Sequence, residues 1–233
     1  QGARLTEKGM ALLPHAGRLL ALNDSICAEL LEPSRRETVR VGVPYDMAGA
    51  HFAPVLEAHA QRYHHVEVKI LSGSSLDLLQ AFDQGQLDLT IVQSPKHQRQ
   101  GERLYSEPLV WLGSGAELAA ERPLPLCFVT PTCTFRRTVF ALLSHAQIGW
   151  RELFENASVE TTLATVRSGL ALTPWLRSLV PSDIPVLGTP FGLPALPDFE
   201  IHLQVSPTAR EASLAMAELI RQHYRAQRGV SWN

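Results

Sequence analysis

The chain has 233 residues, of which 45% are hydrophobic and 19% charged, and its formal net charge is −2. This composition is typical of a globular protein with one large or two modest domains, and the near-neutral charge gives no overall attraction to nucleic acid or membrane. Because no apolar run approaches the roughly 18 residues of a membrane helix, no signal peptide is visible, and three cysteines are few and odd in number, we expect a protein of a reducing compartment without a membrane partner.

A long helix is expected from Leu5 to Glu32, with Thr6 as its N-cap. Apolar residues recur along it in the alternating three- and four-residue rhythm of a coiled coil. Asn23 falls at an a position of this rhythm, where a polar residue fixes the register of a two-stranded pair. The alternative is that the stripe packs on its own domain, but we favour dimerisation between chains through Leu12, Ala16, Leu19, Asn23, Ile26 and Leu30.

Strands and helices alternate after the Pro33–Arg36 linker, which is typical of a mostly parallel sheet covered by helices. We expect strands at Val39–Val43 and Val66–Leu71. A helix at Pro54–Tyr63 lies between them, with Ala60 on its inward face.

The stretch Leu71–Val92 reads as strand end, turn, amphipathic helix, turn and strand, which makes a βαβ unit. Leu76, Leu79 and Phe82 form the expected apolar face of its helix. The turn Ser72–Ser75 supplies hydroxyls that can cap the helix start, and the same free N–H groups favour a carboxylate or a polar ligand oxygen. In sheets of this kind the loop after a strand binds small molecules.

The second half repeats the alternation. Leu104–Gly113 reads as an edge strand that leaves the first domain, and the chain is expected to cross near Trp111–Gly113 and again near Pro181–Val186. The other expected strands are Leu124–Val129, Trp150–Phe154, Leu170–Thr173 and Phe199–Val205, and the helices are Phe135–His145, Val159–Arg167 and Arg210–Arg225; Pro181–Pro197 should be irregular.

Five pieces in this order make the chain resemble the LysR-type transcriptional regulators. They are Arg4–Gly9 with Leu12, Leu13 and Ala16; Val41–Val43; Leu76–Leu89 with Gly85 and Asp88; Glu107–Val110; and Val159–Pro174. The likeness covers essentially the whole chain, while the family's N-terminal winged helix-turn-helix is missing. It implies an α/β fold of two Rossmann-like lobes, of the type 2 periplasmic-binding-protein kind, joined by two crossover strands and preceded by a long linker helix.

The resemblance also implies a domain plan and partners. Residues 1–5 would be a remnant of the DNA-binding wing and residues 6–36 the linker helix and linker. Residues 37–112 and 182–233 would form lobe I, and residues 113–181 lobe II. A small effector, such as an organic acid or an aromatic compound, would lie between the lobes. The full-length regulator would be a cytoplasmic homodimer or homotetramer that binds promoter DNA through the missing domain.

In the family, effectors contact the loops at strand ends that face the cleft. Carried onto this sequence, the contacts are Pro44, Tyr45, Asp46, Ser72, Ser74, Ser75, Thr130, Thr132, Phe135, Arg136, Ser158, Thr173 and Trp175, with Asn156 to Glu160 as a further stretch. Arg136 could pair with an effector carboxylate, or it could form a surface or interlobe ion pair. The hydroxyls could instead only cap helices, and Phe135 and Trp175 could be ordinary core.

Other chemistries find less support. His51, His59, His64 and His65 lack metal-site spacing, so we expect solvated histidines with no metal and no cofactor. Cys127 and Cys133 flank the same loop and could sense oxidants, although the strand position of Cys127 predicts burial.

An enzyme is also disfavoured, because Gly113–Gly115 is only a fragment of a GxSxG motif and lacks its strand-to-helix context. The alternative function is a two-lobed solute-binding receptor of a transport system. The missing signal peptide and the coiled-coil helix speak against it.

Overall fold

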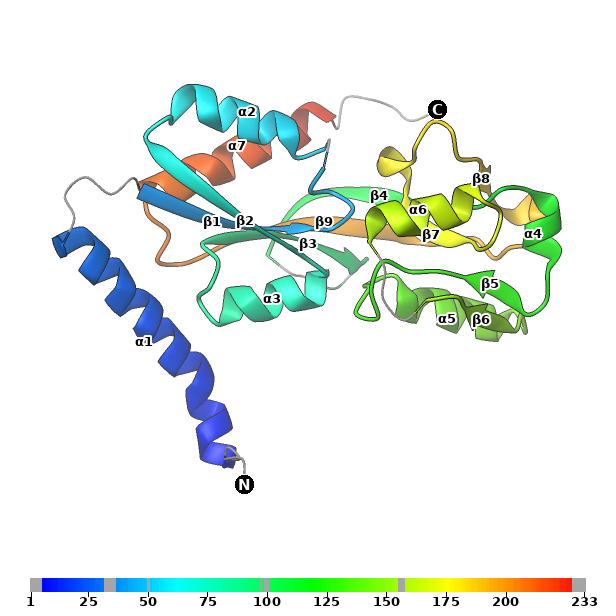
Figure 1. The fold of residues 1–233 in the computed structure, drawn as a ribbon, viewed down its shortest axis with the longest axis horizontal. Helices are drawn as coiled ribbons and strands as arrows, with labels where there is room; N and C mark the ends of the chain where they lie inside the picture. The colour runs from blue at the N-terminus through cyan, green and yellow to red at the C-terminus, as the bar shows by residue number, and fades with distance from the viewer. Residues whose placement is uncertain are drawn as a thin grey trace.

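The structure, a computed structural model, describes residues 6–31, 37–49, 51–96, 98, 101–154 and 158–227. Two α/β lobes lie side by side, and helix α1 (Glu7–Leu31) projects away from lobe I (Figure 1). The predicted two-lobed α/β fold is therefore confirmed. The predicted wing remnant, residues 1–5, and the linker at 32–36 lie outside the described residues.

Helix α1 begins where the sequence predicts, because the Oγ1 of Thr6 accepts a hydrogen bond from the N–H of Gly9 at 3.1 Å. Its contact with its own lobe is small: the Nε of Arg18 donates to the carbonyl of Asp83 at 3.4 Å. The residues predicted to mediate dimerisation face solvent: Leu12 is 62% exposed and Leu19 is 66% exposed. Ile26 and Asn23 are also exposed and Ala16 is half-buried, whereas the side chain of Leu30 lies outside the described part.

Lobe I is built around β1, whose faces are both covered. The elements are β1 (Glu37–Pro44), β2 (Val66–Gly73), β3 (Leu89–Pro95), α2 (Ala53–Arg62), α3 (Ser75–Asp83) and α7 (Glu211–Gln227). β1 pairs in parallel with β2 and with β3. Val39, Val41 and Val43 are fully buried, as expected of a central parallel strand between helices.

Glycine is required at position 42 of β1 because β3 approaches it closely. A Cβ at this position would lie 2.4 Å from the Oγ1 of Thr90 and 2.7 Å from a methyl carbon of Leu87. We expect Gly42→Ala to lower the free energy of unfolding by about 1–3 kcal/mol through overpacking. Gly49→Ala is the matched control, since a Cβ there meets no atom within 4 Å. Urea unfolding of both variants checks the prediction, which fails if they have equal stability.

Two helix faces differ from the prediction. In α3 the buried residues are Ser75, Leu78 and Ala81, while Leu76 is 60% exposed. The reason is that the Oγ of Ser75 accepts a hydrogen bond from the N–H of Gln93 at 2.8 Å, which turns the Ser75 face of α3 onto β3. In α2 the inward residue is His59 rather than Ala60.

Lobe II contains the other elements, apart from two long strands that connect the lobes. These are β5 (Leu124–Leu126), β6 (Trp150–Glu152), β7 (Thr173–Leu176), β8 (Val186–Leu187), α4 (Ala116–Ala120), α5 (Arg136–His145), α6 (Val159–Arg167) and the 3-10 turns η1 (Arg177–Leu179) and η2 (Thr189–Phe191). The strand predicted at Leu170–Thr173 begins only at Thr173. Gly169, at φ 71°, still closes α6, and the N–H of Leu170 bonds the carbonyl of Thr165.

Two long strands connect the lobes. β4 (Glu102–Leu112) pairs with β9 (Asp198–Val205) along its first part and with β7 and β8 near its end. β4 is thus an interior strand, so the prediction that it lies at the edge of the sheet is wrong. The chain returns to lobe I along β9, which pairs with β3. The return predicted near Pro181–Val186 is also wrong, because β8 pairs with Trp111 and Leu112 at the lobe II end of β4.

Candidate functional site

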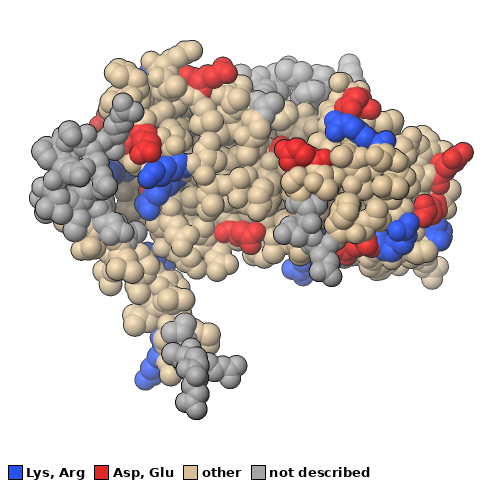
Figure 2. All heavy atoms as spheres, in the orientation of Figure 1, with Lys and Arg blue, Asp and Glu red and all other residues tan. Residues whose placement is uncertain are grey.

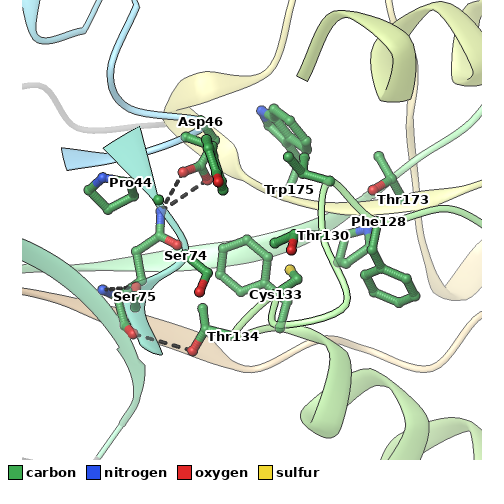
Figure 3. A pocket seen from close by; sticks show the side chains of 16 residues that line it. Pro44, Asp46, Ser74, Ser75, Phe128, Thr130, Cys133, Thr134, Thr173 and Trp175 are labelled. Atoms are coloured by element: carbon green, nitrogen blue, oxygen red, sulfur yellow. Dashed lines mark hydrogen bonds between the residues drawn. The ribbon is translucent and has the colours of Figure 1, made fainter. Parts of the chain in front are cut away.

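A cavity that is partly open to solvent lies between the lobes; the empty space at its site, open solvent included, is about 420 Å³. Its walls come from the end of β1, the start of α3 and β3 on one side, and from the β5–α5 loop and β7 on the other (Figure 3). Nine of the predicted site residues line it: Pro44, Tyr45, Asp46, Ser74, Ser75, Thr130, Phe135, Thr173 and Trp175.

The two serines of the lobe I wall form hydrogen bonds within the protein. The Oγ of Ser74 accepts from the N–H of Asp77 at 3.2 Å and donates to the carboxylate of Asp77 at 2.6 Å. This makes Ser74 the N-cap of α3. Since the Oγ of Ser75 also accepts from Gln93, both hydroxyls have partners within the protein.

The lobe II wall is mainly apolar. Phe135 lies edge to face with Phe199 of β9, with ring centroids 4.9 Å apart. The indole N–H of Trp175 donates to the carbonyl of Leu179 at 3.0 Å, so the ring offers the cavity its apolar surface. Thr134 reaches across to the other lobe and donates to the carbonyl of Gln93 at 3.3 Å.

Four predicted residues do not line the cavity. Ser72 lies in β2 opposite Val43, and Ser158 caps α6 by accepting from the N–H of Thr161 at 3.1 Å. Thr132 donates to the carboxylate of Asp77 at 3.0 Å and so bridges the lobes. Asn156, within the further predicted stretch, lies outside the described residues.

Arg136 is the fourth, and its predicted pairing with an effector carboxylate is not what the geometry shows. Its guanidinium binds both carboxylate oxygens of Glu152, with Nη2–O distances of 2.6 and 2.9 Å, and lies over the ring of Phe140 at 4.9 Å. The surface ion pair considered as the alternative accounts for it.

Gln93 is the principal cavity residue that the sequence prediction missed. Its Nε2 donates to both carboxylate oxygens of Asp46, at 2.8 and 2.9 Å. A signal for it exists in the sequence, because it is a polar side chain at the end of a buried strand, where β3 meets the cavity. The other lining residues not predicted as contacts are Gly73, Phe128, Val129, Cys133, Thr134 and Pro174.

Asp46 is the titratable carboxyl group of the cavity. Burial raises its pKa to about 6, the hydrogen bonds from Gln93 oppose this shift, and the carboxylate of Glu107 adds to it. Glu107 itself is 3% exposed, and burial raises its pKa although it accepts a hydrogen bond from the N–H of Ser178. Two carboxyl groups whose pKa values burial raises thus lie close to each other in this region.

The raised pKa of Asp46 gives a pH-dependent stability. The folded chain holds this proton more tightly than the unfolded chain, so stability falls as pH rises from about 4 to 6. We expect Asp46→Asn to raise the free energy of unfolding by about 1–2 kcal/mol at pH 8, a figure discounted for the partial exposure of the side chain. At pH 4 the variant should gain nothing. Urea unfolding at both pH values checks this, with the exposed Glu57→Gln as control; a gain independent of pH would refute it.

Neither Cys127 nor Cys133 suits oxidant sensing. Burial raises the pKa of Cys127 and that of Cys133 to about 12, so their thiols stay protonated at neutral pH. The described residues contain no group of three His, Cys, Asp or Glu side chains that could hold a metal ion. His59 is 2% exposed, so the solvated histidine predicted there is wrong; it lies against the ring of Tyr63.

Comparison with known proteins identifies the family. Residues 33–225 match the LysR substrate binding domain. The chain belongs to the LysR family. It is 30% identical over 223 residues to the HTH-type transcriptional regulator DgdR of Burkholderia cepacia, covering 95% of this chain and 76% of that protein. It is 25% identical over 204 residues to PecT of Dickeya dadantii, covering 87% and 65%.

A solved LysR regulator supports the same fold. Full-length LysG from Corynebacterium glutamicum with bound effector Arg aligns with a TM-score of 0.66 at 14% identity, over 97% of this chain and 81% of that one. The curated relatives are transcriptional regulators, and residues 33–225 form the effector-sensing domain of a LysR regulator. Among the described residues, no helix is long and apolar enough to span a membrane.

Proposed function

We propose that this chain senses a small molecule in the interlobe cavity and passes the signal to its oligomer. The observation that carries the proposal is that residues of both lobes share one cavity, since Asp46 and Ser74 line it from lobe I and Thr130 and Trp175 from lobe II. A ligand that touches both walls favours one angle between the lobes over others. In a cytoplasmic LysR regulator this angle would set the arrangement of the DNA-binding domains on promoter DNA.

Helix α3 offers a physical connection from the cavity to α1. Its N-cap, Ser74, lines the cavity, and the carbonyl of its last residue, Asp83, accepts from Arg18 of α1. A shift of α3 on ligand binding would therefore reach α1 directly. The exposed leucines of α1 support self-association through this helix.

The competing readings have less support. A solute-binding receptor that acts as a monomer does not need the solvent-exposed apolar face of α1. We expect no catalysis, because the Oγ of Ser75 accepts from the N–H of Gln93 and the Oγ of Ser74 caps α3 and donates to Asp77, so both hydroxyls stabilise the fold of the wall.

Filling the cavity tests the function. A library of metabolites is screened for a rise in melting temperature, and each hit is repeated on Thr130→Trp, whose indole should occupy the cavity. At a ligand concentration of 100 times Kd the wild type should gain about 2.7 kcal/mol, while the variant gains nothing. Thr208→Trp, at an exposed position away from the cavity, should respond as wild type. If no hit depends on Thr130, the proposed sensing site is wrong.

A further inference from the structure

The charge that lines the cavity is of one sign, negative. Among the described residues that line it, Asp46 is the only charged side chain, and none is Lys, Arg or His. Figure 3 shows Asp46 near Pro44 and Trp175, with Ser74 and Thr130 opposite. A carboxylate effector would therefore meet a like charge and no cation, which is an unfavourable environment for it.

Asp46 has no cationic partner in the described chain. Its polar partners are the amide of Gln93 and the backbone N–H groups of Asp46 and Met47, all of them neutral, and the charge that acts on it is the carboxylate of Glu107. An ionised carboxylate accepts about four hydrogen bonds. None of these partners supplies a positive charge, and a positively charged donor would offset the repulsion from Glu107.

Three hydroxyl donors at or beside the cavity are already engaged within the protein. The hydroxyls of Ser74 and Thr132 both donate to the carboxylate of Asp77, which also places a negative charge at the N-terminus of α3. The Oγ1 of Thr134 donates to the carbonyl of Gln93. These three hydroxyl groups therefore offer no donor to an anionic ligand.

The remaining walls suit the apolar part of an organic cation. Tyr45, 40% exposed, Phe135 and Trp175 all line the cavity. Aromatic faces attract ammonium and guanidinium groups as well as hydrocarbon, and more strongly where water is excluded.

We propose that the ligand of this cavity carries a protonated nitrogen, an amine or guanidine, that binds the carboxylate of Asp46 while its hydrocarbon part lies against Tyr45, Phe135 and Trp175. The inference rests on the proposed sensing function and narrows its ligand class. The proposal thus departs from the organic acid that the sequence suggested as one possible effector.

Matched compounds test the charge. Benzylamine, benzyl alcohol and benzoate share one ring, as do cyclohexylamine, cyclohexanol and cyclohexanecarboxylate; L-phenylalanine and L-leucine add a carboxylate to the amine. Binding to the whole chain is measured by calorimetry at pH 8. We expect the amines or the amino acids to bind and the acids and alcohols to bind at least about tenfold more weakly, because only the former pair with a desolvated carboxylate.

Two variants assign the effect to Asp46. Asp46→Asn keeps the shape and should weaken amine binding at least about tenfold, whereas Glu57→Gln, the same charge change on the surface, should leave it unchanged. Wild-type affinity for the amine should also fall from pH 8 to pH 5 as Asp46 gains its proton. Glu107, whose pKa burial also raises, and the protonated groups of Tyr105, Tyr224 and Cys133 face the same region. A pH effect that persists in Asp46→Asn would belong to them.

The outcomes separate the two proposals. Preferred binding of acids or alcohols that is lost in Thr130→Trp overturns the cationic ligand and keeps the sensing site. Binding of an amine or amino acid that is equal in Asp46→Asn and wild type, or no binding of either class, also overturns the cationic ligand. Failure of the sensing function itself is read from the metabolite library, where no hit would depend on Thr130.

Discussion

Replacing Leu12 and Leu19 together by lysine is expected to convert the proposed oligomer into a monomer. Both side chains are more than 60% exposed on α1 and lie seven residues apart, on one face of the helix. Figure 2 shows α1 as largely uncharged on the visible face, whereas side chains of both signs are interspersed on the lobes. Two lysines per chain in a paired seam would bring like charges together and remove the apolar contact that holds the pair. Sedimentation equilibrium measures the change.

Leu170→Lys with Leu214→Lys is the matched control. These leucines are 57% and 52% exposed and belong to the lobes rather than to α1. We expect the control to keep the wild-type mass. An oligomer that survives the Leu12 and Leu19 change but dissociates in the control would place the association surface on the lobes.

Replacing Phe199 by alanine is expected to lower the free energy of unfolding by about 3–5 kcal/mol. Phe199 is fully buried in β9, the strand that returns to lobe I, and its ring packs on Phe135 of lobe II. The cavity left behind would lie directly beneath a residue that lines the ligand pocket. We therefore expect ligand binding to weaken as well, because Phe135 loses the surface that holds it.

Phe191→Ala serves as its control, since this ring is 38% exposed in η2. Its loss of stability should be about 0.5 kcal/mol or less. Denaturant unfolding of both variants gives the comparison, and similar losses for both would show that β9 does not tie the lobes as described.

Local sequence rules predicted most of the elements. Thr6 caps α1, Ser74 caps α3, and Gly85 ends α3 with a φ of 72°, because caps and glycine turns depend on neighbouring residues alone. The alternation of strands and helices gave the α/β class for the same reason. The resemblance to LysR regulators supplied the lobes and nine of the lining residues.

What failed depended on contacts between distant residues. The inward face of α3 is set by the bond between Ser75 and Gln93, and the return strand β9 is identified only by its pairing with β3 and β4. Arg136 was assigned to a ligand because nothing local reveals that Glu152 holds it. Gln93 was missed because its role depends on Asp46, which is 47 residues away.

Hydrogen–deuterium exchange with and without a screened ligand tests most directly whether the cavity between the lobes is the sensing site. A ligand that bridges the lobes should slow exchange at once in Gly73–Ser75 of lobe I and in Phe128–Phe135 of lobe II, the two walls it would contact. Slowed exchange in only one of these segments, or only at α1 or the outer helices, would contradict the account.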